Sequence, residues 1–119
     1  MPTYKVANAT KNTTLGGEIT LADSSEGRRK GLLNQDSLAE GSGLWIYPSE
    51  AVHTFFMRFA IDVIFLDREK RVRKIAANLR PWRMNGCWTA KSVLELPAGT
   101  AERTQTAVGD QLVFERLEA

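Results

Sequence analysis

The only histidine of the chain, His53, lies in its most apolar stretch, VHTFFMRFAIDVIFLD, which runs from residue 52 to residue 67. The same stretch contains Arg58 and Asp62, so an acid–base group, a cation and a carboxylate are close together in sequence. A histidine can act as a general acid or base near neutral pH. An arginine can hold a carboxylate through paired hydrogen bonds. These residue types mark the stretch as a candidate site for ligand binding or proton transfer.

The same residues also have a structural interpretation. If residues 53–58 form a strand, His53 and Met57 share one face and Thr54 and Arg58 the other, because side chains alternate along a strand. Asp62 begins the next apolar run, so it can approach Arg58 across a tight connection. A buried Arg–Asp pair of this kind is first of all structural. A lone histidine is also more often a hydrogen-bonded structural residue than a catalyst.

Glu95 is a second candidate, because it is flanked by Leu94 and Leu96 in an apolar segment. If the two leucines face the core, Glu95 points outward, and this arrangement is slightly favoured by the pattern. If the barrel is open on the other face, Glu95 points into a pocket. There it could bind a ligand or pair with an arginine such as Arg29. The residue pattern leaves both arrangements open.

The chain contains one cysteine, Cys87. A Cys–His nucleophilic pair would need Cys87 within hydrogen-bond reach of His53, and nothing in the sequence indicates that proximity. One histidine and one cysteine do not provide the paired spacing of a metal site. Phosphate-binding and dinucleotide-binding glycine motifs and the nucleophile elbow are all missing. We therefore expect no metal and no cofactor.

A basic region spans residues 68–83, with Trp82 inside it and Trp88 close behind. Small β-barrels bind single-stranded nucleic acid through basic grooves and stacking aromatic rings. A charged edge strand that prevents aggregation gives the same pattern. The net charge of +2 is small, so we favour the edge strand. The basic residues are Arg68, Lys70, Arg71, Arg73, Lys74, Arg80 and Arg83.

Length and composition predict one globular domain over residues 1–119, with 43% hydrophobic and 25% charged residues. Residues 1–17 are expected to be flexible or to form an edge strand. A lone cysteine excludes an internal disulfide and favours a reducing cytoplasm. No run is long enough to span a membrane. The oligomeric state is not indicated.

Short apolar runs separated by Gly, Pro, Asn and Asp predict a mainly β or α+β fold, a small barrel-like or sandwich domain with one or two short helices. The run at 61–66 is apolar throughout, so that strand should be covered on both faces. Strands are expected at residues 4–7, 18–22, 43–47, 53–58, 61–66, 71–75, 92–96 and 111–115, a helix at 25–33 and a helical turn at 100–105.

Several segments resemble, in order, the sequence blocks of one family. The segments are RKGLL at 29–33, GSGLWI at 41–46, HTFFMR at 53–58, IDVIFLD at 61–67, VLELPAG at 93–99 and VGD at 108–110. Together they resemble the DUF192 family, the uncharacterised conserved proteins of COG1430. The resemblance runs from about residue 18 to residue 114. It implies a small β-barrel-like domain and no accepted reaction.

The leading hypothesis is a small ligand-binding module whose concave site is lined by Trp45, His53, Phe55 and Met57. An enzyme, hydrolase-like or other, that uses His53 or Glu95 as acid or base is the second. An interaction domain for single-stranded nucleic acid or a protein, acting through the basic region, is the third. The candidate ligand-binding residues are His53, Thr54, Met57, Arg58, Asp62, Glu95 and Arg29.

Overall fold

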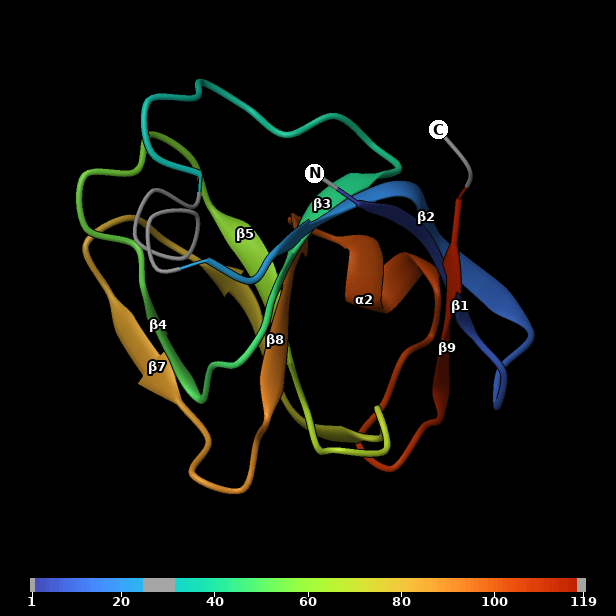
Figure 1. The fold of residues 1–119 in the computed structure, drawn as a ribbon. Coiled ribbons are helices and arrows are strands. Elements are labelled where there is room, and N and C mark those ends of the chain that lie inside the picture. Colours follow the sequence, from blue (N-terminus) through green and yellow to red (C-terminus); the bar gives the residue numbers. More distant parts are fainter. Residues whose placement is uncertain (1, 25–31, 118–119) are drawn as a thin grey trace.

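The computed structural model describes residues 2–24 and 32–117 and consists mainly of β-strands (Figure 1). The expected helix at 25–33 falls largely outside these residues. The described elements are β1 (Thr3–Asn8), β2 (Thr13–Ala22), β3 (Ser42–Ile46), β4 (Ala51–His53), β5 (Ile61–Leu66), β6 (Val72–Leu79), β7 (Met84–Gly86), β8 (Ser92–Pro97), α2 (Thr100–Arg103) and β9 (Leu112–Arg116).

Seven strands form one curled sheet in the order β6-β5-β8-β3-β2-β1-β9 (Figure 1). The short helix α2 lies between β8 and β9 in sequence. All neighbours are antiparallel except β2 and β3. The edge strands approach each other at one end, where Arg71 and Gln111 form an isolated bridge. There the Leu112 N–H donates to the carbonyl of Lys70 over 3.1 Å. The sheet is therefore a half-barrel.

The concave face of this sheet holds the larger core. Its residues come from strands at both edges of the sheet. Side chains from the two edges can belong to one cluster only because the sheet curls around them. They are Val6, Leu15, Ile19, Trp45, Ile64, Leu66, Val72, Leu94, Leu96 and Leu112. Burial of such side chains is the main stabilising term of a domain.

A second apolar layer covers the convex face. It joins the sheet to the loop after β2 and to a separate two-stranded sheet of β4 and β7, which we call the ribbon. All six residues of β5 are buried, so the prediction that this strand is covered on both faces is confirmed. The layer contains Ala22, Leu32, Leu44, Ile46, Val52, Met57, Ile61, Val63, Phe65 and Val93.

The mainly β fold with a short helix is confirmed, but two local predictions were wrong. The strand expected at 53–58 ends at His53. The Met57 N–H then donates to the carbonyl of Thr54 over 3.2 Å, and Phe56 has a φ of 67°. The chain turns there because Thr54 bonds to residues 80–83 instead of continuing a ladder. The N-terminal strand β1 lies between β2 and β9, not at an edge.

Candidate functional site

Four aromatic side chains meet at the concave face: Tyr4, Trp45, Tyr47 and Phe114, which we call the concave cluster. The Trp45 ring lies 4.3 Å from that of Phe114 and 5.1 Å from that of Tyr4, measured between centroids. Tyr47 packs against Trp45 at 6.0 Å. Most pairs are edge-to-face or tilted, the arrangement that aromatic quadrupoles favour. Residues far apart in sequence thus build one aromatic surface.

Strand pairing explains why these rings converge. Trp45 on β3 lies opposite Leu94 on β8, and Phe114 on β9 lies opposite Val6 on β1. Opposite residues of an antiparallel pair point to the same face, and both partners belong to the concave core. Phe114 is half-buried and Tyr47 is 39% exposed. The cluster therefore extends from the core to the surface.

The indole N–H of Trp45 has no hydrogen-bond partner although its nitrogen is buried. Trp45 as a whole is only 7% exposed. The one other such atom among the described side chains is Oδ1 of Asn85. A buried donor without an acceptor costs about 1–3 kcal/mol, and such groups are rare in native proteins. The cluster therefore presents an unused hydrogen-bond donor.

Lys70 brings a positive charge to the same place. Its ammonium nitrogen lies 5.5 Å from the ring centroid of Trp45 and 5.8 Å from that of Phe114, within cation–π range. Arg116 faces the same side, because it is paired with Tyr4 across β1 and β9. No salt bridge to Lys70 or Arg116 is found in the described part of the chain. The cluster offers donors and cations, and it lacks an anionic acceptor.

Glu95, by contrast, lies on the convex face and is buried, so the solvent-facing arrangement, one of the two left open by the sequence, does not occur. It is paired with Leu44 on β3 and Val63 on β5, and both belong to the convex layer. The residue is 4% exposed. Burial raises the pKa of its carboxyl from 4.5 to about 7, because an apolar environment disfavours the charged form. The suggested partner, Arg29, lies outside the described residues.

The predicted pair of Arg58 and Asp62 does not form. Arg58 is exposed and binds Asp36 instead, with 2.7 Å between nitrogen and oxygen. Asp62 is 1% exposed and accepts backbone N–H bonds from Asn78 at 2.8 Å, Ala101 at 2.9 Å and Gly99 at 3.2 Å. Two of these donors lie at the start of α2, where a carboxylate is favourable. Asp62 therefore connects β5 to α2 and is fully occupied by the fold.

The remaining predicted residues are divided between surface and core. His53 is exposed at the end of β4 and accepts the Phe55 N–H at its Nδ1 over 3.3 Å. Thr54 is fully buried, and its hydroxyl donates to the carbonyl of Arg80. Met57 belongs to the convex layer, whereas Trp45 belongs to the concave core. The expected site lined jointly by Trp45, His53 and Met57 is therefore not assembled.

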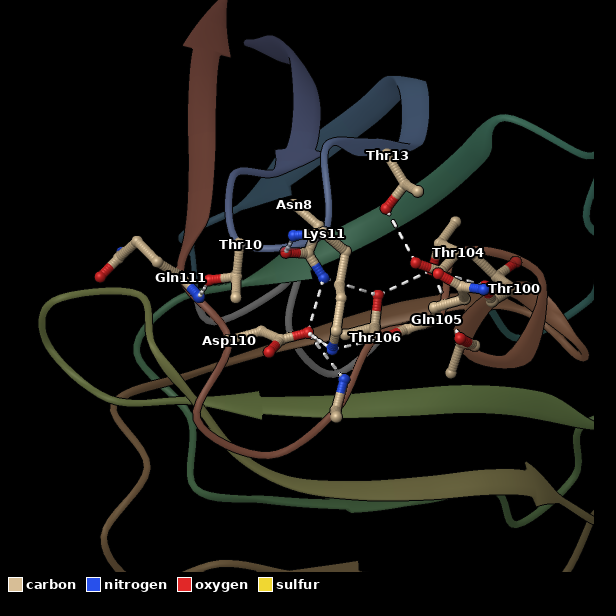
Figure 2. Close-up of polar contacts among 12 residues, drawn as sticks. Asn8, Thr10, Lys11, Thr13, Thr100, Thr104, Gln105, Thr106, Asp110 and Gln111 are labelled. Carbon is tan, nitrogen blue, oxygen red and sulfur yellow. Dashed lines mark hydrogen bonds and ion pairs between the residues drawn. The ribbon is translucent and has the colours of Figure 1, made fainter.

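Sequence reasoning missed a polar network around Asp110, shown in Figure 2. The Oδ2 atom of Asp110 accepts bonds from Asn8 and Lys11, both at 2.9 Å, and from the Ala107 N–H at 3.0 Å. Asn8 is fully buried and also donates to the Thr106 hydroxyl. The donors and acceptors satisfy one another, so the network ties β1 to the turn before β9. Its only sequence signal was the Gly-Asp turn.

The described residues include one free cysteine, no metal-binding group of side chains and no membrane-spanning helix. Cys87 is a half-buried thiol whose sulfur lies 3.3 Å from the hydroxyl of Thr89. No group of three or more His, Cys, Asp or Glu side chains is placed to hold a metal ion within residues 2–24 and 32–117. Over the same residues, no helix is long and apolar enough to cross a membrane.

Comparison with known proteins agrees with the fold. The profile of DUF192, described as Uncharacterized ACR, COG1430, matches residues 6–114. The chain belongs to the DUF192 family. A UPF0127 protein of Pyrococcus abyssi is 35% identical to this DUF192 chain over 114 residues, covering 90% of the chain and 94% of the relative.

Two solved structures share the DUF192 fold. One is a protein of unknown function from Novosphingobium aromaticivorans, with a TM-score of 0.80 and 25% identity, covering 95% of this chain and 84% of that one. The other comes from Sinorhizobium meliloti, with a TM-score of 0.82 and 22% identity, covering 95% and 92%. These matches establish the family and the architecture, and the family carries no assigned activity.

Proposed function

We propose that this DUF192 protein binds a small organic anion with a flat apolar body, and that the ligand contacts the concave cluster. The observation that carries the proposal is the buried indole N–H of Trp45, which has no acceptor in the described part of the chain. A ligand carboxylate would supply that acceptor. Charge-assisted hydrogen bonds of this kind are among the strongest in proteins.

The neighbouring charges support an anion over a cation. An aromatic cage alone would suit a quaternary ammonium ligand. Here the ammonium of Lys70 already lies near two of the rings, and Arg116 faces the same side. A second cation would be repelled, whereas a carboxylate would be attracted by Lys70 and could accept from Trp45. The rings would cover the apolar body, in the usual division of roles within a ligand site.

The alternative enzyme hypothesis gains less support. His53 is exposed at the end of β4, whereas Glu95 is buried against Leu44 and Val63. No contact between the two is found among the described residues. A general acid and base acting on one substrate need to converge on it. We therefore retain the ligand-binding module as the proposed function.

The test is a thermal-shift titration with benzoate, benzamide and benzylamine, which share a ring and differ in head group. Benzoate should raise the unfolding temperature most, since a ligand at a hundred times its Kd adds about 2.7 kcal/mol of stability. Trp45→Phe removes the indole N–H and Lys70→Met removes the charge, so each should weaken benzoate binding. Trp82→Phe is the matched control at an exposed tryptophan. Equal shifts with benzylamine, or unchanged benzoate binding by Trp45→Phe, would contradict the proposal.

A further inference from the structure

The outer face of the ribbon carries a second aromatic surface, distinct from the concave cluster. Strand pairing places His53 opposite Met84, and both are exposed. Phe55, Phe56 and Trp82 continue this face beyond the strand ends. Phe56 is 70% exposed, Trp82 is 56% and Met84 is 71%. We call these five residues the ribbon surface; Figure 1 shows β4 and β7 side by side, at the opposite side of the fold from β1 and β9.

The rings of the ribbon surface form a stacked series. The ring of His53 lies 5.0 Å from that of Phe55 at an interplanar angle of 27°, and Phe55 lies 6.0 Å from Trp82 at 28°. Phe56 lies 4.7 Å from Trp82 at an interplanar angle of 58°, so its ring is tilted against the end of the series. Nearly parallel rings with exposed faces can receive further flat rings, and every nucleobase has such a face.

The fold holds this surface in a strained conformation. Phe56 and Trp82 both have a φ of 67°, a left-handed conformation that is costly for bulky residues. Thr54 fixes both positions, because its carbonyl accepts the N–H groups of Trp82 and Met57 at 3.0 and 3.2 Å. Its hydroxyl accepts the Arg83 N–H at 2.9 Å. Two exposed rings are thus positioned by the backbone and hydroxyl of one buried residue, which is expected of a preorganised binding surface.

The charge around the ribbon is one-sided. No Asp or Glu occurs between Glu69 and Glu95. The whole chain has 16 Lys and Arg against 14 Asp and Glu. Seven of the basic residues lie in this segment, so the remainder of the chain carries more acidic than basic residues. Those seven residues are Lys70, Arg71, Arg73, Lys74, Arg80, Arg83 and Lys91.

Two of these cations are sequence neighbours of Trp82, and a third reaches the ribbon at Gly86. Arg80 and Arg83 flank Trp82 in sequence and are exposed. Lys74 reaches the ribbon, because its ammonium donates to the carbonyl of Gly86 over 2.8 Å. The acidic residue nearest in sequence to β4 is Glu50, which directly precedes that strand. Cations beside stacked rings match the alternation of phosphates and bases in a single strand.

We infer that the ribbon surface binds single-stranded nucleic acid, with bases stacked on Trp82 and Phe56 and phosphates near Arg80 and Arg83. A charged edge strand explains the basic residues of β6. It does not explain exposed stacked rings held by Thr54. Large exposed apolar patches usually mark interaction sites. This function is separate from anion binding at the concave cluster, so either can fail without the other.

The experiment is fluorescence anisotropy with a labelled oligothymidine of about twelve nucleotides, within the site size of small barrels. Trp82→Ala should weaken binding by roughly tenfold or more if one base stacks there. Trp88→Ala is the matched control, because Trp88 is 87% exposed and makes no ring contact in the described structure. Circular dichroism of both variants confirms that the fold is retained.

Two further arms separate stacking from charge. Replacing Arg80 and Arg83 by Gln should reduce the slope of log affinity against log salt by about 1–2. A duplex of the same length should bind more weakly than the single strand at equal salt, because its bases are already stacked. Equal binding of duplex and single strand, or equal losses from Trp82→Ala and Trp88→Ala, would overturn the inference. Absence of binding at about 50 mM salt would overturn it as well.

Discussion

Two buried polar groups on neighbouring strands face opposite sides of the sheet. The indole N–H of Trp45 faces the concave core, and the carboxyl of Glu95 faces the convex layer. They stand on adjacent strands, one register step apart, since Trp45 pairs with Leu94 and Leu44 pairs with Glu95. Their burial is similar, at 7% and 4% exposure. The two groups differ in chemistry and in their surroundings.

The difference lies in how each group can compensate for its burial. A carboxyl can relieve its burial by taking up a proton, and the raised pKa of Glu95 expresses this. The indole N–H of Trp45 has no such route, because it neither gains nor loses a proton in the physiological range. In the proposed complex, the ligand carboxylate supplies the acceptor that the described side chains do not provide. Lys70 adjoins Trp45, whereas the cross-strand neighbours of Glu95 are apolar. We therefore assign the binding role to the concave face.

The largest effect is expected at a third buried polar group, the carboxyl of Asp62, which has partners. Asp62→Ala leaves the N–H groups of Asn78, Gly99 and Ala101 without their acceptor, and it should cost about 3 kcal/mol or more. Urea unfolding measures the loss. Arg58→Ala is the control, since its exposed ion pair is worth about 0–1 kcal/mol. Similar losses in both variants would show that Asp62 does not support α2.

Glu95→Gln should raise the free energy of unfolding at neutral pH, whereas Asp62→Ala should lower it. The pKa of Glu95 is about 7 in the folded protein against an ordinary 4.5. The folded state therefore binds a proton more tightly than the unfolded state. Stability from this group is complete below pH 4.5 and is lost as the pH rises to about 7, by roughly 3 kcal/mol. Glu95→Gln removes this dependence and should be more stable than wild type above that range.

Urea unfolding between pH 4 and pH 8 checks the prediction, with about equal spacing of points across the titration. The pKa of Asp110 shifts in the opposite direction to that of Glu95, so its effect on stability has the opposite pH dependence. Burial by itself raises the pKa of Asp110, but hydrogen bonds from Asn8, Lys11 and Ala107 lower it below 3.8 overall. Its stabilising contribution is present above that value and is lost as the pH falls. An unchanged difference between wild type and Glu95→Gln across the range would refute the assignment.

Trp45→Phe should change stability least, within about 1 kcal/mol. The smaller ring loses packing in the concave core, and the same substitution removes a donor whose burial costs about 1–3 kcal/mol. The two terms oppose each other. Thermal unfolding measures the balance. A loss of about 3 kcal/mol or more would mean that the N–H already has a partner in the protein.

The sequence predicted the fold better than it predicted the site. The apolar run at 61–66 was sufficient for β5, and the next expected strand at 71–75 lies largely within β6, because local patterns define both. The turn at Thr54 was missed, because it depends on bonds to residues 80–83, far along the chain. The face of Glu95 depends on whether a second layer covers the sheet, and no periodicity reports that. The cytoplasmic location stays a prediction.

The concave cluster also depends on contacts between distant segments, which local sequence patterns do not predict. Trp45 lies in the core, and its neighbours Tyr4 and Phe114 are distant in sequence. Only the strand order brings them together. The ammonium of Lys70 reaches the cluster from the turn between β5 and β6. Sequence reasoning instead grouped Trp45 with His53, which belongs to the opposite side of the sheet.

The most direct test of the account is the indole N–H signal of Trp45 in a proton–nitrogen correlation spectrum of isotope-labelled protein. The chain has three tryptophans, and single Trp→Phe variants assign their signals. Titration with benzoate should shift the Trp45 signal strongly and leave those of Trp82 and Trp88 nearly unchanged, and benzylamine should leave all three in place. Saturating benzoate that moves only the exposed tryptophans, or none of them, would contradict the claim that the concave cluster binds an anion.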